Sequence, residues 1–246
     1  MTSIKRPLTR SDYLDPLKEY YHDVVADDYE ERIENLKHKG VALLIIDMQY
    51  LDAAEGYGVF RDITASGIPV EQQRYYFDTL KEYVIPNMQL LLKTFREKNM
   101  EVIHTRIQSL TNDGRDRSTG HKRLGLLAPP GSKESEFLPQ VAPLDNEIII
   151  NKTASGVFSS TNLNYVLQNL SVHELVVAGV YTNECVETTI RDACDLGYLV
   201  SMVDDACTTV TPELHKATIT TLKDRYASVV CTQEIVERYK LRLKNI

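Results

Sequence analysis

Three side chains that could together carry out nucleophilic catalysis each stand where an apolar run of the sequence ends. Asp47 closes the run VALLIID, Lys152 follows EIIIN, and Cys185 comes shortly after LVVAGV. A thiolate attacks carbonyl carbon, a carboxylate can take the thiol proton, and an ammonium group stabilises the anions that form. The three residue types therefore predict a cysteine nucleophile that works with an acid and a lysine.

The stretch around Cys185 places its thiol in the first turn of an expected helix. Leu175 to Val180 suits a strand that is buried on both faces. The helix is expected to open near Glu184, with Thr182 and Asn183 capping its first N–H groups. Those N–H groups and the helix dipole are expected to lower the pKa of the thiol and to supply donors for an oxyanion. Placement alone leaves one alternative, a small buried apolar residue.

Apolar runs and helical segments alternate along the chain, and this alternation indicates right-handed βαβ units. The expected strands cover 41–47, 101–106, 147–151, 174–180, 199–203 and 227–231, and the main expected helices cover 71–98, 161–170, 184–196, 212–225 and 232–243. The predicted fold is α/β, with three α/β/α layers and a doubly wound, mostly parallel six-stranded sheet. One domain over 39–246 is expected to follow an N-terminal helical extension over 1–38.

Ligands of such a sheet bind beyond the carboxyl ends of its strands, which adds residues after the second strand to the candidate site. Arg106 and Gln108 could bind a substrate carboxylate or a urea oxygen, although Arg106 suits a structural ion pair equally well. The long loop-like segment 108–138 is expected to have a functional role, because loops of this length in a compact domain usually do. Cys207 is the rival thiol, whereas Cys194 and Cys231 are expected in the core.

Composition favours small molecules as partners. The net charge is −7 and no long basic run occurs, so neither nucleic acid nor an anionic membrane is an expected partner. The four cysteines form no CxxC pair, which is typical of thiols in a reducing compartment and predicts a cytoplasmic location. No stretch reaches the roughly 18 apolar residues that a membrane span needs.

Three motifs, in this order, resemble the isochorismatase-like cysteine hydrolases: VALLIIDMQ, INKTASGVFSSTNLNYVL and VVAGVYTNECVETTIRDACDLGY. The resemblance runs from about residue 40 to residue 231. It implies that Asp47, Lys152 and Cys185 form a catalytic triad. It also implies a non-proline cis peptide bond between Val180 and Tyr181.

The pattern TNxCVExTxRDA is most similar to a branch that contains ureidoacrylate, biuret and N-carbamoyl amide hydrolases. This similarity implies hydrolysis of a C–N bond in a small amide or carbamoyl (ureide) substrate through a thioester acyl-enzyme. The N–H groups of Tyr181 and Cys185 would then form the oxyanion hole. Two alternatives remain, a vinyl-ether hydrolase of the isochorismate type, in which the cysteine is often missing, and a catalytically idle interaction subunit.

The chain also departs from the family pattern. It reads DMQYLD where members usually read DMQNDF, which puts Asp52 where an aromatic side chain often lines the pocket. The nicotinamidase branch carries a DxH pair and a further histidine for a metal, and the segment Asp52 to Ala54 lacks that histidine. No metal and no cofactor are therefore expected, and His104, His121, His173 and His215 stand singly in the sequence. The tyrosine-rich segment before residue 40, and the assemblies of the family, predict a homo-oligomer, either a dimer or a tetramer.

Overall fold

A computed structural model describes residues 40–62, 64 and 66–242, so the extension expected over 1–38 lies outside the described residues. Its sheet has six strands in the order β3-β2-β1-β4-β5-β6, and every neighbouring pair is parallel. The predicted three-layer α/β/α fold with a doubly wound sheet is thereby confirmed. The strands are β1 (Val41–Ile46), β2 (Glu101–Ile107), β3 (Ile148–Lys152), β4 (Glu174–Val180), β5 (Leu199–Thr208) and β6 (Ser228–Val230).

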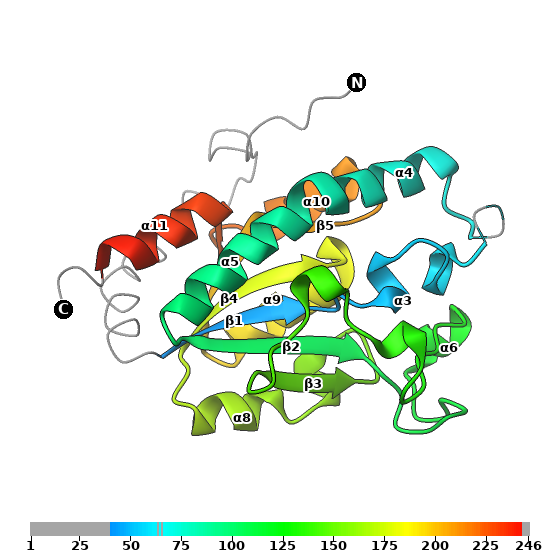
Figure 1. Cartoon of the computed structure of the whole chain (residues 1–246), viewed down its shortest axis with the longest axis horizontal. Coiled ribbons are helices and arrows are strands. Elements are labelled where there is room, and N and C mark those ends of the chain that lie inside the picture. Colours follow the sequence, from blue (N-terminus) through cyan, green and yellow to red (C-terminus); the bar gives the residue numbers. More distant parts are fainter. Residues whose placement is uncertain (1–39, 63, 65, 243–246) are drawn as a thin grey trace.

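Helices cover both faces of the sheet (Figure 1). One face carries α4 (Val70–Thr79), α5 (Ile85–Glu97) and α11 (Thr232–Arg242), and the other carries α8 (Leu163–Asn169), α9 (Glu187–Asp195) and α10 (Pro212–Leu222). Successive side chains of a strand point to opposite faces, so Leu43 and Ile45 of β1 pack with the first group, and Leu44 and Ile46 pack with the second. A continuous apolar run in β1 is what this two-sided burial requires.

The sequence predicts a helix over 71–98 that is kinked or divided at Pro86. The structure agrees, because a π-helical turn, Leu80–Val84, divides this helix just before Pro86, which lies in the first turn of α5. The helix expected over 161–170 is preceded by a short one, α7 (Val157–Ser160). No helix in the described part of the chain is long and apolar enough to cross a membrane.

The strand order reverses between β1 and β4, so the carboxyl ends of these two central strands lie side by side. Gly179 of β4 pairs with Ile46 of β1 at this point. Its φ is +136°, and a Cβ atom there would collide with the carbonyl oxygen of Ile46. Only glycine therefore permits this close approach of the two strands. The reversal point of a doubly wound sheet is where its ligands bind.

Candidate active site

Asp47, Lys152 and Cys185 come together at the carboxyl edge of the sheet. The Lys152 Nζ atom lies 2.8 Å from Oδ2 of Asp47 and donates a hydrogen bond to the Cys185 Sγ atom at 3.3 Å. It also donates to the carbonyl oxygen of Ala154 at 2.9 Å. Lys152 is fully buried, and Cys185 is only 4% exposed. The ammonium group thus links the acid to the thiol in a site that is largely closed to water.

Backbone geometry aims Asp47 at the lysine. Asp47 follows β1 directly and has a φ of +52°, in the left-handed region that aspartate tolerates better than most residues. Its N–H group donates to the carbonyl oxygen of Thr105 at 3.1 Å, and the Thr105 hydroxyl donates to Oδ1 of Asp47 at 2.9 Å. These two bonds to β2 fix the carboxylate and leave its Oδ2 atom for Lys152.

Cys185 lies on a π-helical turn, η6 (Thr182–Val186), that leads into α9. The Val180–Tyr181 peptide bond before this turn is cis, as the resemblance implies. The expected capping by Thr182 and Asn183 was wrong, because neither side chain bonds the first N–H groups of the turn. Their hydroxyl and amide groups bond neighbouring elements instead, and the wider π-helical turn begins earlier than the expected helix.

Thr182 is the first link of a hydrogen-bonded chain that anchors this turn. Its hydroxyl lies 2.8 Å from Nδ1 of His215 on α10, and Nε2 of His215 lies 2.7 Å from Oδ1 of Asp204. The strand expected over 199–203 is longer than predicted, because β5 extends to Thr208 and contains Asp204. These hydrogen bonds therefore tie the turn that carries Cys185 to α10 and to β5.

Electrostatics at the thiol differ from the expectation. Burial raises the pKa of Cys185 well above its ordinary value, Lys152 opposes this effect, and the carboxylates of Asp47 and Asp52 add to it. The expectation that the thiol pKa is lowered was therefore wrong, because the effect of burial on this pKa outweighs the effect of the helix start. Burial alone would lower the pKa of Lys152, yet the charge of Asp47 and the Cys185 sulfur raise it above its usual value. The resting site thus holds a protonated thiol beside an Asp47–Lys152 ion pair.

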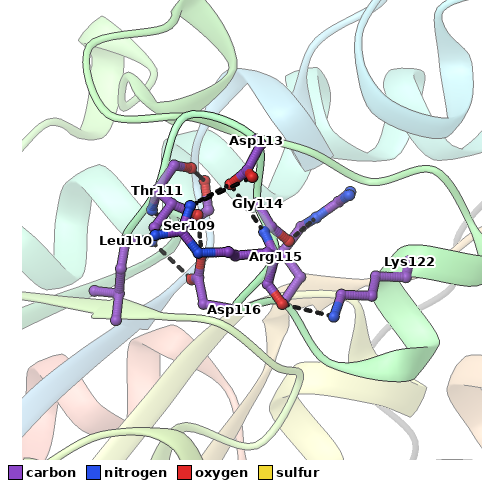
Figure 2. Close-up of polar contacts among 9 residues, drawn as sticks. Ser109, Leu110, Thr111, Asp113, Gly114, Arg115, Asp116 and Lys122 are labelled. Atoms are coloured by element: carbon purple, nitrogen blue, oxygen red, sulfur yellow. Dashed lines mark hydrogen bonds and ion pairs between the residues drawn. The ribbon is translucent and has the colours of Figure 1, made fainter.

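The segment between β2 and β3 is ordered by its own polar groups. The Asp116 carboxylate accepts hydrogen bonds from the N–H groups of Leu110, at 2.7 Å, and Thr111, at 3.2 Å, and from the Thr111 hydroxyl at 2.6 Å. Figure 2 shows this cluster, together with the bond from Lys122 to the carbonyl oxygen of Arg115. The cluster leads into the short helix α6 (Thr119–Arg123).

α6 carries His121 into the surroundings of the triad. His121 is 4% exposed, and its Nδ1 atom has no hydrogen-bond partner among the described residues. Burial, together with the positive charge of Lys152, lowers the pKa of His121 to about 4. From the sequence, His121 was expected to stand alone, without a role in a site. Only the length of segment 108–138 indicated that this region has a function.

Arg106 lies at the carboxyl end of β2 and Gln108 directly follows this strand, and the Arg106 side chain bonds structural partners. Its guanidinium group donates to Oδ1 of Asn151 at 2.7 Å and to the carbonyl oxygen of Ser135 at 2.9 Å. Gln108 is buried, and its N–H group donates to the carbonyl oxygen of Lys152 at 3.0 Å. Substrate binding by these two residues stays a prediction, and the mechanism below makes no use of them.

The other thiols lie in different surroundings. Cys207 is buried within β5, where burial raises its pKa above the ordinary value, and it pairs in register with Gly179. Cys194 and Cys231 are half-buried, so the expectation that they lie in the core was wrong. Over residues 40–62, 64 and 66–242, the structure contains no group of three or more His, Cys, Asp or Glu side chains that could hold a metal ion.

A buried cysteine lies beside an aspartate–lysine pair at the reversal point of a doubly wound sheet, and these three groups could together act in nucleophilic catalysis. The isochorismatase domain family matches residues 41–234, so the chain belongs to the isochorismatase family of hydrolases.

The relatives of this chain include proteins with a named activity and proteins without one. An uncharacterised isochorismatase family protein of Bacillus subtilis, YwoC, is 27% identical, over 84% of this chain and 97% of its own. The ureidoacrylate amidohydrolase RutB of Acinetobacter baylyi is 32% identical, over 47% and 48%. The N-carbamoylsarcosine amidase of an Arthrobacter species is 26% identical, over 63% and 61%. The chain is thus related to amidohydrolases that act on small molecules.

Solved structures support the fold. The crystal structure of a cysteine hydrolase from Pseudomonas syringae pv. phaseolicola superimposes with a TM-score of 0.67. The match covers 83% of this chain and 94% of that one at 24% sequence identity. At this identity the likeness concerns the α/β/α architecture.

Proposed function

We propose that this protein hydrolyses a C–N bond of a small amide or carbamoyl (ureide) substrate through a thioester acyl-enzyme. The observation that carries the proposal is the position of the Lys152 Nζ atom, 2.8 Å from the Asp47 carboxylate and 3.3 Å from the Cys185 sulfur. Each of the three groups has a chemical task in such a reaction. Arg106 and Gln108, near the carboxyl end of β2, have no assigned step.

In the first half-reaction, Cys185 attacks the substrate carbonyl carbon and its thiol proton passes to Asp47. The resting thiol is protonated, so the base must act at the moment of attack, and the ion pair with Lys152 holds the carboxylate in place for it. In this proposal the N–H groups of Tyr181 and Cys185 bind the oxyanion. Asp47 then gives the proton to the leaving nitrogen, the C–N bond breaks, and an amine or ammonia departs.

In the second half-reaction, water attacks the thioester carbonyl carbon and Asp47 takes one of its protons. The C–S bond breaks, the proton returns to the sulfur, and the carboxylic or carbamic acid product leaves. Lys152 keeps its proton, because the neighbouring Asp47 carboxylate holds its pKa above the ordinary value. Its role in the proposal is to stabilise each anionic state of the sulfur.

Ammonia release from a panel of small amides and ureides tests this function directly. We expect release with at least one class, together with an acylated Cys185 peptide in mass spectra of acid-quenched mixtures. Hydrolysis without any acylated Cys185, under conditions in which acylation is faster than deacylation, would contradict the thioester route.

Treatment with a chelator is expected to leave turnover unchanged. The reason is that the proposed steps use only protein groups, and the described residues offer no cluster suited to a metal ion. The measurement compares ammonia release before and after incubation with EDTA and gel filtration. Activity that is lost and then restored by a divalent ion would sink this expectation.

We further propose that the protein is a homo-oligomer, a dimer or tetramer. The basis is the tyrosine-rich sequence before residue 40, since tyrosine is enriched in interfaces. Light scattering over a range of micromolar concentrations should give a mass of at least two chains. A monomeric mass throughout that range would refute the proposal.

A further inference from the structure

Asp52 is a buried carboxyl group that the mechanism above does not use. It lies in the short helix α3 (Tyr50–Ala53), is 3% exposed, and its Oδ2 atom has no hydrogen-bond partner in the described part of the chain. Buried polar atoms are almost always paired, because an unpaired one loses its bonds to water without compensation. Such an atom beside a binding site indicates that a ligand supplies the missing partner.

The backbone of Asp52 is held next to the nucleophile's turn. Its carbonyl oxygen accepts hydrogen bonds from the hydroxyl groups of Tyr76, at 2.8 Å, and Tyr181, at 3.0 Å. Tyr181 directly precedes the turn that carries Cys185. The Asp52 carboxyl group is near enough to the triad to interact electrostatically with Asp47, Lys152 and Cys185.

Positive charge is scarce around this side chain. The carboxylates of Asp47 and Glu184 act on Asp52, and Lys152 is the cation that acts on it. Lys152 already serves Asp47, Ala154 and the thiol. His121 supplies no charge near neutral pH, because burial and the lysine hold its pKa at about 4. Three carboxyl groups therefore share one ammonium group that is fully engaged.

This imbalance makes Asp52 costly to ionise without a ligand. Burial, and next the charge of Asp47, raise the pKa of Asp52 well above its ordinary value. A cation that entered the site would pair with the carboxylate and relieve both the burial cost and the repulsion. A substrate carboxylate that entered would instead be repelled by Asp47, Asp52 and Glu184. The cation that acts on Asp52, Lys152, already bonds other groups.

We propose that Asp52 receives a positively charged nitrogen group of the substrate, a protonated amine or an amidinium, and that the site selects cationic amides or ureides over carboxylate-bearing ones. The proposal rests on the proposed function for the bond that is cleaved. Ligand selection can nevertheless be measured without turnover, because Cys185 itself can report which charges reach it.

The test uses two thiol reagents of similar size and opposite charge, aminoethyl and sulfonatoethyl methanethiosulfonate. Each forms a disulfide with the sulfur of Cys185 and releases methanesulfinate. The rate at the Cys185 peptide is followed by mass spectrometry and divided by the rate with N-acetylcysteine amide, a neutral free thiol. In the wild type we expect this ratio to favour the cationic reagent by about tenfold or more, the effect of one nearby charge in a poorly solvated site.

Asp52→Asn should reduce that preference by at least about fivefold, since it removes the carboxyl group that ionises when a cation enters the site and keeps the size of the side chain. The substitution leaves the two tyrosine bonds to the backbone carbonyl intact, and thermal unfolding verifies the fold. Asp52→Glu keeps the charge and should retain the preference. Asp78→Asn, the same change at an exposed position on α4, is the matched control and should leave the ratio unchanged.

The outcomes separate this inference from the proposed function. An equal normalised rate for both reagents in the wild type, or a preference that survives in Asp52→Asn, would overturn the assignment to Asp52. If Cys185 reacts with neither reagent while the half-buried Cys194 does, the nucleophile is inaccessible and both proposals fail. Where turnover is found, kcat/KM should fall from the cationic β-alaninamide to the neutral butanamide and then to the anionic succinamate. Asp52→Asn should make the differences in kcat/KM between these three substrates smaller.

Discussion

Cys185→Ala is expected to abolish turnover, with a fall of roughly four orders of magnitude or more in kcat, as for other enzymes that lose their nucleophile. The alanine side chain cannot form the acyl-enzyme, so only slow direct attack by water remains. Cys185→Ser should be nearly as inactive, because a hydroxyl group is far less acidic than a thiol and Asp47 is a weak base for it. The measurement is ammonia release on the substrate that gives the highest wild-type rate.

The fold should survive this change. The backbone carbonyl oxygen of Cys185 accepts a hydrogen bond from the Thr189 hydroxyl at 2.6 Å, and this bond does not involve the thiol. Cys207→Ala is the matched control, since it removes a second buried thiol that lies inside β5, and it should retain turnover. Normal turnover by Cys185→Ala would show that Cys185 is not the nucleophile. Loss of turnover in Cys207→Ala alone would assign the nucleophile to Cys207 instead.

The positions of the triad could be predicted because they depend on features that are local in sequence. Long apolar runs rich in β-branched residues mark buried parallel strands, and parallel strands place their carboxyl ends on one edge. Asp47, Lys152 and Cys185 each follow such a run, so their meeting needed only the strand order. The reversal between β1 and β4 then follows from the connections on the two sides.

The surroundings of the triad could not be predicted, because they depend on contacts between distant segments. His121 reaches the site on a loop that is folded by Asp116, and nothing in the local sequence indicates its direction. The same holds for the link from Thr182 to His215, which joins two helical segments across the sheet edge.

The direction of the thiol pKa shift also needed the structure. The start of a helix lowers a thiol pKa, and complete burial raises it, so the outcome depends on how far the site is closed. The sequence indicates the helix start near Cys185 but not how completely its thiol is buried. The consequence is mechanistic, since a protonated resting thiol needs Asp47 as a base during attack, whereas a resting thiolate would not.

Lys152→Ala is expected to lose most of its turnover, and its thiol should become harder to ionise. The Lys152 ammonium group lowers the pKa of Cys185 against the effect of burial, so its removal raises that pKa further. At a fixed neutral pH the thiolate fraction then falls, and alkylation by iodoacetamide slows. We expect the midpoint of the alkylation rate against pH to move upward, by an amount equal to the lost attraction of one charge at 3.3 Å from the sulfur.

Stability should fall as well, because the substitution leaves the Asp47 carboxylate buried without its partner. Removal of one member of a buried ion pair costs about 3–5 kcal/mol, or the carboxylate takes up a proton to avoid part of that cost. Protonation would remove the base that the mechanism needs, so either response lowers turnover. Lys152→Met keeps most of the side-chain volume and separates the loss of charge from the loss of packing. Lys93→Ala removes an exposed lysine of a surface pair and should change stability by less than about 1 kcal/mol.

Lys152→Arg decides whether any positive charge is sufficient. The Nζ atom donates at once to Asp47, Ala154 and Cys185, three partners that surround a compact ammonium group. A guanidinium group is planar and larger, and its donors lie in one plane, so it cannot bond all three in a fully buried position. We therefore expect Lys152→Arg to recover part of the thiol ionisation but little of the turnover. If the alkylation profiles of wild type and Lys152→Ala coincide across pH, Lys152 is not coupled to Cys185, and its ammonium group has no part in forming the thiolate.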